Sequence, residues 1–274
     1  MYCKIKKKSR INPIFTHWFR KLDMKTPKIW FSLLERYEYL GDGPAIYPKN
    51  SFEWEKLFEG KHELIFSELQ NYINTISQPT SYFNYEMVNK HGAWKTIPLM
   101  SWGVHFHKHK RHFPETYKLV KQIPNLVSLS FNVLEPKSNI KPHFGDTNAM
   151  VRCHYGLQVP SGLPDIGFRV KDEQQAWKEG ELLIFCDGYV HEAWNNTDKQ
   201  RIIMLFDVIL PEYESKKRRI CGTVLSSIFF QSMLLRLKLK EPPKPILRLM
   251  TFFAKYSAIA LTPIYNFVGK IRYK

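Results

Sequence analysis

The sequence predicts a mainly β protein whose core is a jelly roll, with helices before it and a helical extension after it. Six runs of β-favouring residues follow one another between residues 94 and 212, separated by turn residues. Short strands at this spacing are typical of a sandwich or barrel of the jelly-roll kind. The chain has 274 residues, of which 44% are hydrophobic, so it can bury a substantial core and wholesale disorder is excluded. The runs are TIPLMSWGV, NLVSLSFNVL, AMVRCHYGLQV, IGFRV, ELLIFC and RIIMLFDVIL.

The pattern of charge and hydrophobicity divides the chain into four segments. The first combines basic runs with an amphipathic stretch from Pro27 to Tyr39, which predicts a basic arm and one helix. The second is a helical lead-in, because apolar residues recur near helical spacing from Trp54 to Ile73. The third is the jelly roll, with one short helix that begins near Pro114, and the fourth is a basic, apolar, helical extension. Their bounds are residues 1–50, 51–93, 94–212 and 213–274.

The net charge of +16 belongs to the two ends of the chain. Residues 1–30 carry a net +8 and residues 213–274 a net +11, which leaves the centre at −3. Basic ends are attracted to phosphate-bearing surfaces, either nucleic acid or the anionic face of a membrane. We expect a membrane surface and not nucleic acid to be the partner, because the C-terminal segment is also strongly apolar.

Two uncharged runs in the C-terminal segment favour a membrane surface. The runs from Ile220 to Leu235 and from Tyr256 to Val268 contain aromatic residues and are flanked by Lys and Arg. Both are shorter than the roughly 20 apolar residues of a spanning helix, so we expect them to lie in the membrane interface. The alternative that the sequence leaves open is a pair of helices packed on the core, with solvated Lys and Arg along their edges.

The cysteines and the first residues of the chain favour a cytoplasmic protein. Cys3, Cys153, Cys186 and Cys221 show no C-x-x-C spacing, which argues against a zinc ribbon, an iron–sulfur cluster or a disulfide-stapled secreted module. The first ten residues, MYCKIKKKSR, lack the apolar core of a signal peptide. We therefore expect a cytoplasmic location, peripheral on the inner face of a membrane.

Two sections of the third segment resemble a known enzyme family. Residues 140–159 read IKPHFGDTNAMVRCHYGLQV, and residues 177–211 read WKEGELLIFCDGYVHEAWNNTDKQRIIMLFDVILP. Their order and spacing are similar to the aspartyl/asparaginyl β-hydroxylase family of Fe(II)- and 2-oxoglutarate-dependent oxygenases. The resemblance covers residues 94–212 and implies a double-stranded β-helix, the cupin-like form of the jelly roll. It rests on Pro142, His143, Gly145, Thr147, Asn148, Arg152, His154, Gly156, Leu157, Trp177, Gly180, Phe185, Asp187, His191, Glu192, Trp194, Asn195, Arg201 and Asp207.

A non-haem iron site needs imidazole ligands that face one cavity and leave positions open for the co-substrate and O₂. His143 and His191 can supply them, because these two positions of a jelly roll can meet across the mouth of the barrel. Most facial-triad enzymes carry an acid two residues after the first His, and here that residue is Gly145. The resemblance implies that water takes the vacant position. Asp146 is not expected to be a ligand, because neighbouring strand residues point to opposite faces.

The co-substrate 2-oxoglutarate carries two carboxylates, and the sequence offers candidates for both. Arg201 stands at the head of an apolar strand, where its guanidinium would form a bidentate pair with the distal carboxylate. Asn132 occupies a position where the family usually has a Ser that helps to bind this carboxylate, and it can still donate a hydrogen bond.

The resemblance implies that Arg152 and His154 hold the C1 end of 2-oxoglutarate. Their spacing of two residues places both on one face of a strand. The alternative for Arg152 and Arg201 is a structural ion pair with Asp187 or Asp207.

The implied function is hydroxylation of an unactivated C–H bond by O₂, with succinate and CO₂ as co-products. The resembled family includes hydroxylases of Asp or Asn in peptides and of acyl chains on membrane lipids. The basic, apolar ends favour a membrane-proximal substrate, and a peptidyl substrate stays open. A non-catalytic, membrane-associated jelly-roll binding module that lost its metal is the rival interpretation.

Overall fold

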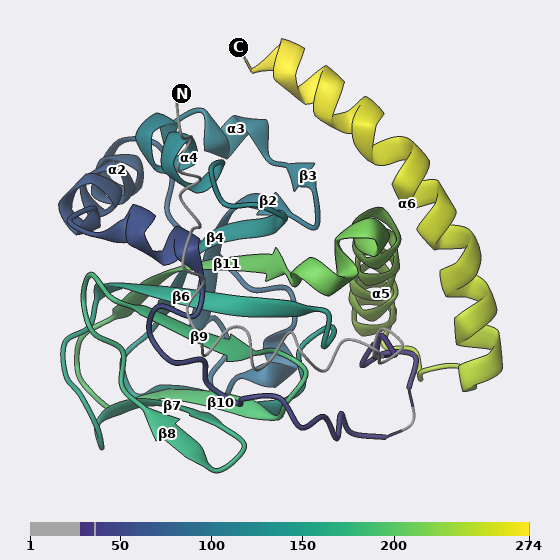
Figure 1. The fold of residues 1–274 in the computed structure, drawn as a ribbon, viewed down its shortest axis with the longest axis horizontal. Helices are drawn as coiled ribbons and strands as arrows, with labels where there is room; N and C mark the ends of the chain where they lie inside the picture. Colours follow the sequence, from purple (N-terminus) through teal and green to yellow (C-terminus); the bar gives the residue numbers. More distant parts are fainter. Residues whose placement is uncertain (1–27, 36, 274) are drawn as a thin grey trace, which may run out of the picture.

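Two antiparallel β-sheets stacked face to face form the centre of the molecule, so the predicted jelly roll is confirmed (Figure 1). The computed structural model describes residues 28–35 and 37–273. The larger sheet contains β1 (Thr80–Ser81), β2 (Trp94–Ser101), β3 (Val104–His105), β4 (Leu126–Leu134), β6 (Met150–Gln158), β9 (Leu182–Cys186) and β11 (Arg201–Ile209). The smaller sheet contains β5 (Ser138–His143), β7 (Ile166–Val170), β8 (Glu173–Gln175) and β10 (His191–Asn195).

All six predicted runs are strands, and their order in space explains how residues from distant motifs meet. The larger sheet runs β1-β2-β4-β11-β6-β9, with β3 beside β2, and the smaller sheet runs β5-β10-β7-β8. β11 therefore lies between β4 and β6, while β5 and β10 face them from the other sheet. The sequence pattern did not predict β5 and β10 as runs of their own, because they carry polar residues such as Asn139, His143 and His191.

The larger sheet is buried on both faces, which explains its nearly continuous apolar runs. In β11, Ile202, Met204 and Phe206 pack under the N-terminal helices. The alternate residues Arg201, Ile203 and Leu205 point the other way and line a cavity between the sheets. Polar groups in these strands are thus placed in the space between the sheets.

Helices cover the outer face of the larger sheet, in agreement with the predicted helical lead-in (Figure 1). Ile65 and Leu69 of one helix and Phe113 at the start of another are fully buried in the same core cluster as Phe131 of β4. The expected short helix is α4, with Pro114 in its first turn. The helices on this face are η1 (Glu53–Phe58), α2 (His62–Thr75), α3 (His107–Lys110) and α4 (Pro114–Val120), whereas η2 (Tyr85–Met87) lies beside β5 of the smaller sheet.

The prediction of a helix from Pro27 to Tyr39 is wrong for the described part of that stretch. Residues 28–35 form turns and an isolated bridge, and we call them the strap. Phe31 pairs with Thr147, and the Ser32 N–H donates to the Asp146 carbonyl at 3.2 Å. Contacts with a loop more than 100 residues away override the helical pattern. The expected basic arm, residues 1–27, lies outside the described residues.

The C-terminal segment forms two long helices, α5 (Lys217–Leu237) and α6 (Lys244–Arg272), preceded by η3 (Pro211–Lys216). The expectation that the first run is too short to span a membrane is corrected, because the helical stretch Pro211–Leu237 is long and apolar enough by length and composition. A core helix of a soluble protein meets the same criterion. Ile220 and Val224 of α5 are buried against Trp102, Met150 and Ile209, so α5 packs on the core, as the alternative interpretation held.

A tight backbone crossing positions the loop that precedes β9. The Gly156 N–H donates to the Glu181 carbonyl at 3.1 Å, and the Gly180 N–H donates to the Gly156 carbonyl at 2.9 Å. A Cβ at Gly156 would overlap the carbonyl of Lys178. The loop also contains Trp177, which lies against Arg201 and His154.

We expect Gly156→Ala to lower the free energy of unfolding by about 1–3 kcal/mol, because the added methyl group must displace backbone atoms. The control is Gly43→Ala, where an added Cβ meets nothing within 4 Å. Urea denaturation followed by circular dichroism would measure both. Equal midpoints for the two variants would contradict the close contact.

Candidate active site

A cavity that is partly open to solvent lies between the two sheets. Its walls come from strands of both sheets, with β4, β6 and β11 on one side and β5, β7 and β10 on the other. The structure therefore brings together every residue that the sequence singled out for metal or co-substrate binding. These residues are Asn132, His143, Arg152, His154, His191 and Arg201.

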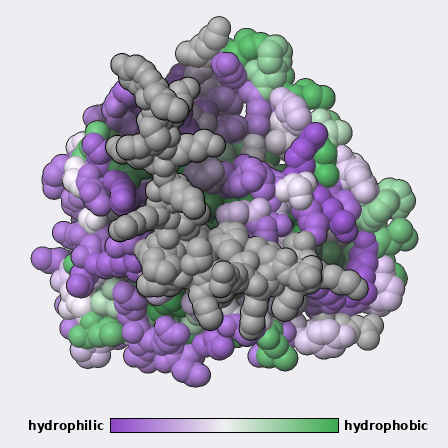
Figure 2. All heavy atoms as spheres, in the orientation of Figure 1, coloured by the Kyte–Doolittle hydropathy of each residue, from purple (hydrophilic) through white to green (hydrophobic). Residues whose placement is uncertain are grey.

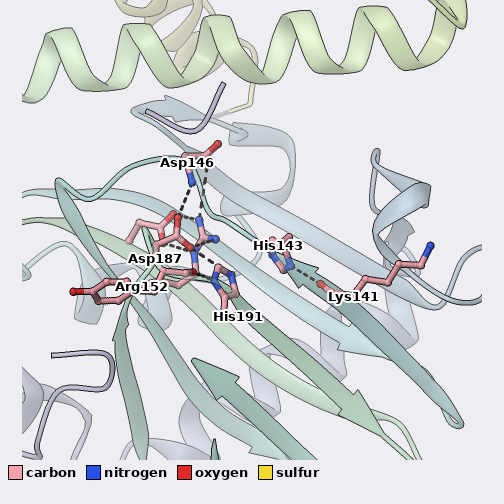
Figure 3. Close-up of polar contacts among 8 residues, drawn as sticks. Lys141, His143, Asp146, Arg152, Asp187 and His191 are labelled. Carbon is pink, nitrogen blue, oxygen red and sulfur yellow. Dashed lines mark hydrogen bonds and ion pairs between the residues drawn. The ribbon is translucent and has the colours of Figure 1, made fainter. Parts of the chain in front are cut away.

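The two candidate metal ligands are neighbours on adjacent strands. His143 ends β5 and His191 begins β10, and the two residues are paired in the antiparallel register. Their ring centroids lie 4.2 Å apart (Figure 3). The imidazoles thus meet side by side at one end of the smaller sheet, whereas the sequence placed them across the mouth of the barrel.

Hydrogen bonds fix the tautomer of both imidazoles. Nδ1 of His143 contacts the Lys141 carbonyl at 2.8 Å, and Nδ1 of His191 contacts the Tyr189 carbonyl at 2.8 Å. A carbonyl only accepts, so each Nδ1 carries the proton and each Nε2 keeps its lone pair. Burial lowers both pKa values to about 3, and for His143 the neighbouring His191 adds to this effect. Both rings are therefore neutral at physiological pH.

This donor set fits a divalent transition metal with open positions. Two neutral imidazoles, each held by a backbone carbonyl through Nδ1, are ligands of the usual kind for iron. Within residues 28–35 and 37–273, no group of three or more His, Cys, Asp or Glu side chains is arranged to hold a metal ion. The part of the chain that the structure describes thus offers the histidine pair without a protein carboxylate ligand.

Asp187 occupies the space where an acid two residues after His143 would lie. A Cβ at Gly145 would overlap the Asp187 carboxylate, so only glycine fits there. The Asp146 N–H donates to Asp187 Oδ2 at 2.8 Å, and Asp187 Oδ1 lies 3.7 Å from His191 Nε2. A carboxylate from the turn before β10 therefore stands beside the histidine pair (Figure 3).

Arg152 is the partner of buried carboxylates, which is the alternative that the sequence left open. Its Nε and Nη2 atoms donate to Asp207 at 2.8 and 3.2 Å, and its Nη1 atom lies 2.6 Å from Asp187 Oδ1. Burial alone would lower the pKa of Arg152, but Asp187 and Asp207 outweigh it and hold this pKa well above its ordinary value. Burial and the charge of Asp187 raise the pKa of Asp146 to about 7.

Arg201 is also buried, but unlike Arg152 it has no carboxylate partner among the described residues. Only 2% of the residue is exposed, and its Nε has no hydrogen-bond partner among the described residues. Its guanidinium lies over the ring of Trp177, 4.4 Å from the centroid. Burial lowers the pKa of Arg201 to about 9, and no carboxylate in the described part of the chain offsets this effect. The guanidinium of Arg201 is therefore a buried cation that could pair with an anionic ligand in the cavity.

Two tryptophans orient the remaining polar groups. Trp177 Nε1 donates to His154 Nδ1 at 3.2 Å, so His154 keeps its proton on Nε2. Burial, together with Arg201 and Arg152, holds the pKa of His154 well below its ordinary value. Trp94 Nε1 donates to Asn132 Oδ1 at 2.9 Å, and Asn132 Nδ2 donates to Ser130 Oγ at 2.8 Å.

The sequence analysis named Trp177 only as part of the family resemblance and did not single out Trp94. Trp94 could have been found from the sequence, because a buried indole N–H needs a hydrogen-bond partner and Asn132 is a polar residue in the neighbouring apolar strand.

Comparisons with known proteins agree with this geometry. The sequence model of the aspartyl/asparaginyl beta-hydroxylase family matches residues 59–211. The ornithine lipid ester-linked acyl 2-hydroxylase of Rhizobium tropici is 32% identical over 184 residues, which cover 66% of this chain and 65% of that protein. The human aspartyl/asparaginyl beta-hydroxylase is 30% identical over 139 residues, 49% of this chain and 18% of its own length. The chain spans less than two thirds of each of these relatives.

Solved structures with similar folds are more distant. HygX from Streptomyces hygroscopicus, with nickel and 2-oxoglutarate bound, has a TM-score of 0.39 and 9% identity, over 54% of this chain and 79% of its own. The viral collagen prolyl hydroxylase of Paramecium Bursaria Chlorella virus-1 has a TM-score of 0.34 and 10% identity, over 54% of this chain and 91% of its own.

The two buried arginines should respond in opposite ways to the same substitution when metal and 2-oxoglutarate are absent. We expect Arg201→Met to raise the free energy of unfolding by about 1–4 kcal/mol, because it removes a buried charge without a partner. We expect Arg152→Met to lower it by about 3–5 kcal/mol, because it leaves Asp187 and Asp207 buried without a counter-charge. Urea titrations in a buffer free of carboxylates and phosphate would measure both, and a loss of stability in Arg201→Met as large as that in Arg152→Met would contradict the assignment.

Proposed function

The chain belongs to the aspartyl/asparaginyl β-hydroxylase family, and we propose that it is an Fe(II)- and 2-oxoglutarate-dependent hydroxylase. The observation that carries this proposal is the buried Arg201, which has no acidic partner among the described residues. A buried charge is costly unless an opposite charge pairs with it. The distal carboxylate of 2-oxoglutarate is a ligand that pairs with a guanidinium through two parallel hydrogen bonds.

His143 and His191 are the residues that would hold iron, through the Nε2 atoms that their hydrogen bonds leave unprotonated. Asp187 lies beside them and adds negative charge, which favours a divalent cation at this place. The chemistry that iron supplies when bound is the oxidative decarboxylation of 2-oxoglutarate by O₂ to succinate and CO₂, coupled to hydroxylation of an unactivated C–H bond.

The residues around the histidine pair would orient the co-substrate. His154 lines the cavity as a neutral ring with its proton on Nε2, so it can donate a hydrogen bond to the C1 carboxylate end. Arg152 lines the same wall and provides positive charge there, while Asp187 and Asp207 keep its guanidinium in a fixed orientation. Asn132 has a second amide N–H beyond the one given to Ser130, and it can donate this to the distal carboxylate.

We further propose that the substrate is an acyl chain of a membrane lipid. The rest of the cavity wall is mainly apolar, formed by Trp94, Ile140, Phe168, Ala193, Ile203 and Leu205. The remaining charged residue there is Glu192, which pairs with Arg169 at 2.6 Å. With Arg152 and Arg201 engaged, the described lining residues offer no further cation for an aspartate side chain. The rhizobial relative is named for acyl 2-hydroxylation, which agrees with this choice.

An Asp or Asn residue of a peptide is the second candidate substrate, because the human relative is named for hydroxylation of these residues. We place the enzyme on the cytoplasmic face of a membrane. Anionic lipids there attract its basic ends, and the reducing cytosol keeps its cysteines free. The rival interpretation, a non-catalytic binding module, leaves the two metal-competent imidazoles and the unpaired Arg201 without a role.

The reaction can be tested by following succinate formation from 2-oxoglutarate with Fe(II) and ascorbate. We expect His191→Ala to reduce turnover at least about 100-fold, because the metal site loses one of its two imidazoles. The matched control is His91→Ala, a histidine that is exposed and outside the cavity, which should leave turnover unchanged. If His191→Ala turned over as fast as the wild type, the protein would not be an enzyme of this kind.

The substrate can be tested by mass spectrometry after incubation with a bacterial lipid extract or with an Asp-containing peptide. We expect the gain of one oxygen on a lipid acyl chain and no change in the peptide, because the free part of the cavity wall is apolar. Fragmentation would place the oxygen on the acyl chain. Oxidation of the peptide alone would favour the second candidate instead.

A further inference from the structure

One side of α6 exposes a row of large apolar side chains along its whole length. Leu249, Phe253, Tyr256, Ile264 and Phe267 are each more than half exposed, and their spacing of three, four or eight residues places them on one face of the helix. Other exposed apolar residues of α6 are Ile246, Phe252, Leu261, Tyr265, Val268 and Ile271. In Figure 2 hydrophobic residues are green at the upper and right-hand edge of the molecule, where Figure 1 shows α6. A continuous apolar surface of this kind marks an interaction site.

The opposite side of α6 is already occupied. Leu247, Thr251 and Lys255 are buried, and Leu247 packs against Leu33 of the strap and Phe230 of α5. The helix therefore has a fixed orientation on the molecule, and its exposed apolar face, the row defined above, is turned away from the core.

The exposed cations near this face favour an anionic partner. Residues 236–274 contain nine Lys and Arg and a single acid, Glu241, which is paired with Lys244 at 2.5 Å. Lys255 is buried, whereas Lys238 and Lys240 before α6 and Lys270 and Arg272 at its end are exposed. A second copy of this chain would bring two sets of these cations together, which is unfavourable.

We propose that the exposed apolar face of α6 docks in the interface of an anionic lipid bilayer. The exposed apolar residues of α6 extend from Ile246 to Ile271, about 38 Å at 1.5 Å per residue. A bilayer surface offers an apolar boundary of that length beside phosphate groups, which matches both the row and the cations. This docking does not depend on the reaction proposed above.

The contacts of α5 favour docking in the interface over a span. Ile220 and Val224 are 0% and 1% exposed, and they fill the space beside Trp102 and Ile209. A span through α5 would uncover this part of the core. The side chains of α6, by contrast, can enter the interface without any rearrangement of the described residues.

The strap connects the docking face to the candidate active site. Lys244 Nζ donates to the Leu33 carbonyl at 2.9 Å, and Arg248 Nη2 donates to the Leu34 carbonyl at 3.1 Å. On its other side the strap contacts the loop that follows His143. Thr147 Oγ1 in that loop donates a hydrogen bond to the Trp30 carbonyl of the strap at 2.7 Å. Docking of α6 thus holds the cavity close to the bilayer.

Flotation of the purified full-length chain with lipid vesicles tests the proposal. We expect binding to vesicles of equal parts phosphatidylcholine and phosphatidylglycerol, and weaker binding to phosphatidylcholine alone. The triple variant Leu249→Gln, Phe253→Gln and Phe267→Gln should lower the partition coefficient at least about 100-fold, since these side chains then stay in water. The matched control replaces three exposed apolar residues of the body in the same way, Leu40→Gln, Ile76→Gln and Leu163→Gln, and should bind like the wild type.

Two outcomes would overturn the proposal. One is equal flotation of the α6 variant and the wild type, or no flotation of either. The other is a wild-type dimer that the α6 substitutions convert to a monomer in sedimentation analysis, which would mean that a second copy covers this face. Succinate formation without lipid should be equal in the α6 variant and the wild type, so a failure of docking and a failure of the proposed reaction are distinguishable.

Discussion

The ion pairs of Arg152 are the constraint on which the candidate site depends. Its carboxylate partners come from separate segments, with Asp207 on β11 and Asp187 in the turn before β10. Asp146, in the loop after β5, lies 4.0 Å away. Because buried charges are stable only beside opposite charges, these pairs hold the turn and the loop against β6. His191 follows Asp187 by four residues, and the loop that contains Asp146 starts directly after His143, so the same pairs set the positions of both imidazoles.

The two buried arginines differ in what offsets the cost of their burial. Arg152 is compensated by the protein itself, whereas Arg201 has no acidic partner in the described residues. An anionic ligand can supply this compensation, and a ligand that binds only the folded state stabilises it by an amount that rises with the logarithm of the ligand concentration. On the proposed function, 2-oxoglutarate is therefore both the co-substrate and the group that completes the core at this position.

The sequence predicted those parts of the fold that are decided locally. The six predicted strand runs are visible because most of their residues are apolar and buried, and α4 is visible from Pro114 at its start. The strap was wrongly predicted as a helix, because its pairing with Thr147 involves residues that no local pattern can reveal. The six candidate site residues were chosen from ordered motifs, and the structure places them around one cavity. The pairing of Arg152 with Asp207 follows from the register of β6 and β11, which the motifs do not give. Periodicity predicted a helix in α6 and could not show which of its faces is covered.

The surplus positive charge and the chemistry of the cavity act at different places. On the proposed function, Arg201, Arg152 and their hydrogen-bonding neighbours would bind the carboxylates of 2-oxoglutarate, and the charge of the C-terminal segment would have no part in this binding. That charge stands instead beside the exposed apolar face of α6. An acyl chain of a membrane lipid is scarcely available in water, and an enzyme held at the bilayer meets it at a high effective concentration. The strap, which contacts both α6 and the loop after His143, gives this localisation a direct structural connection to the cavity.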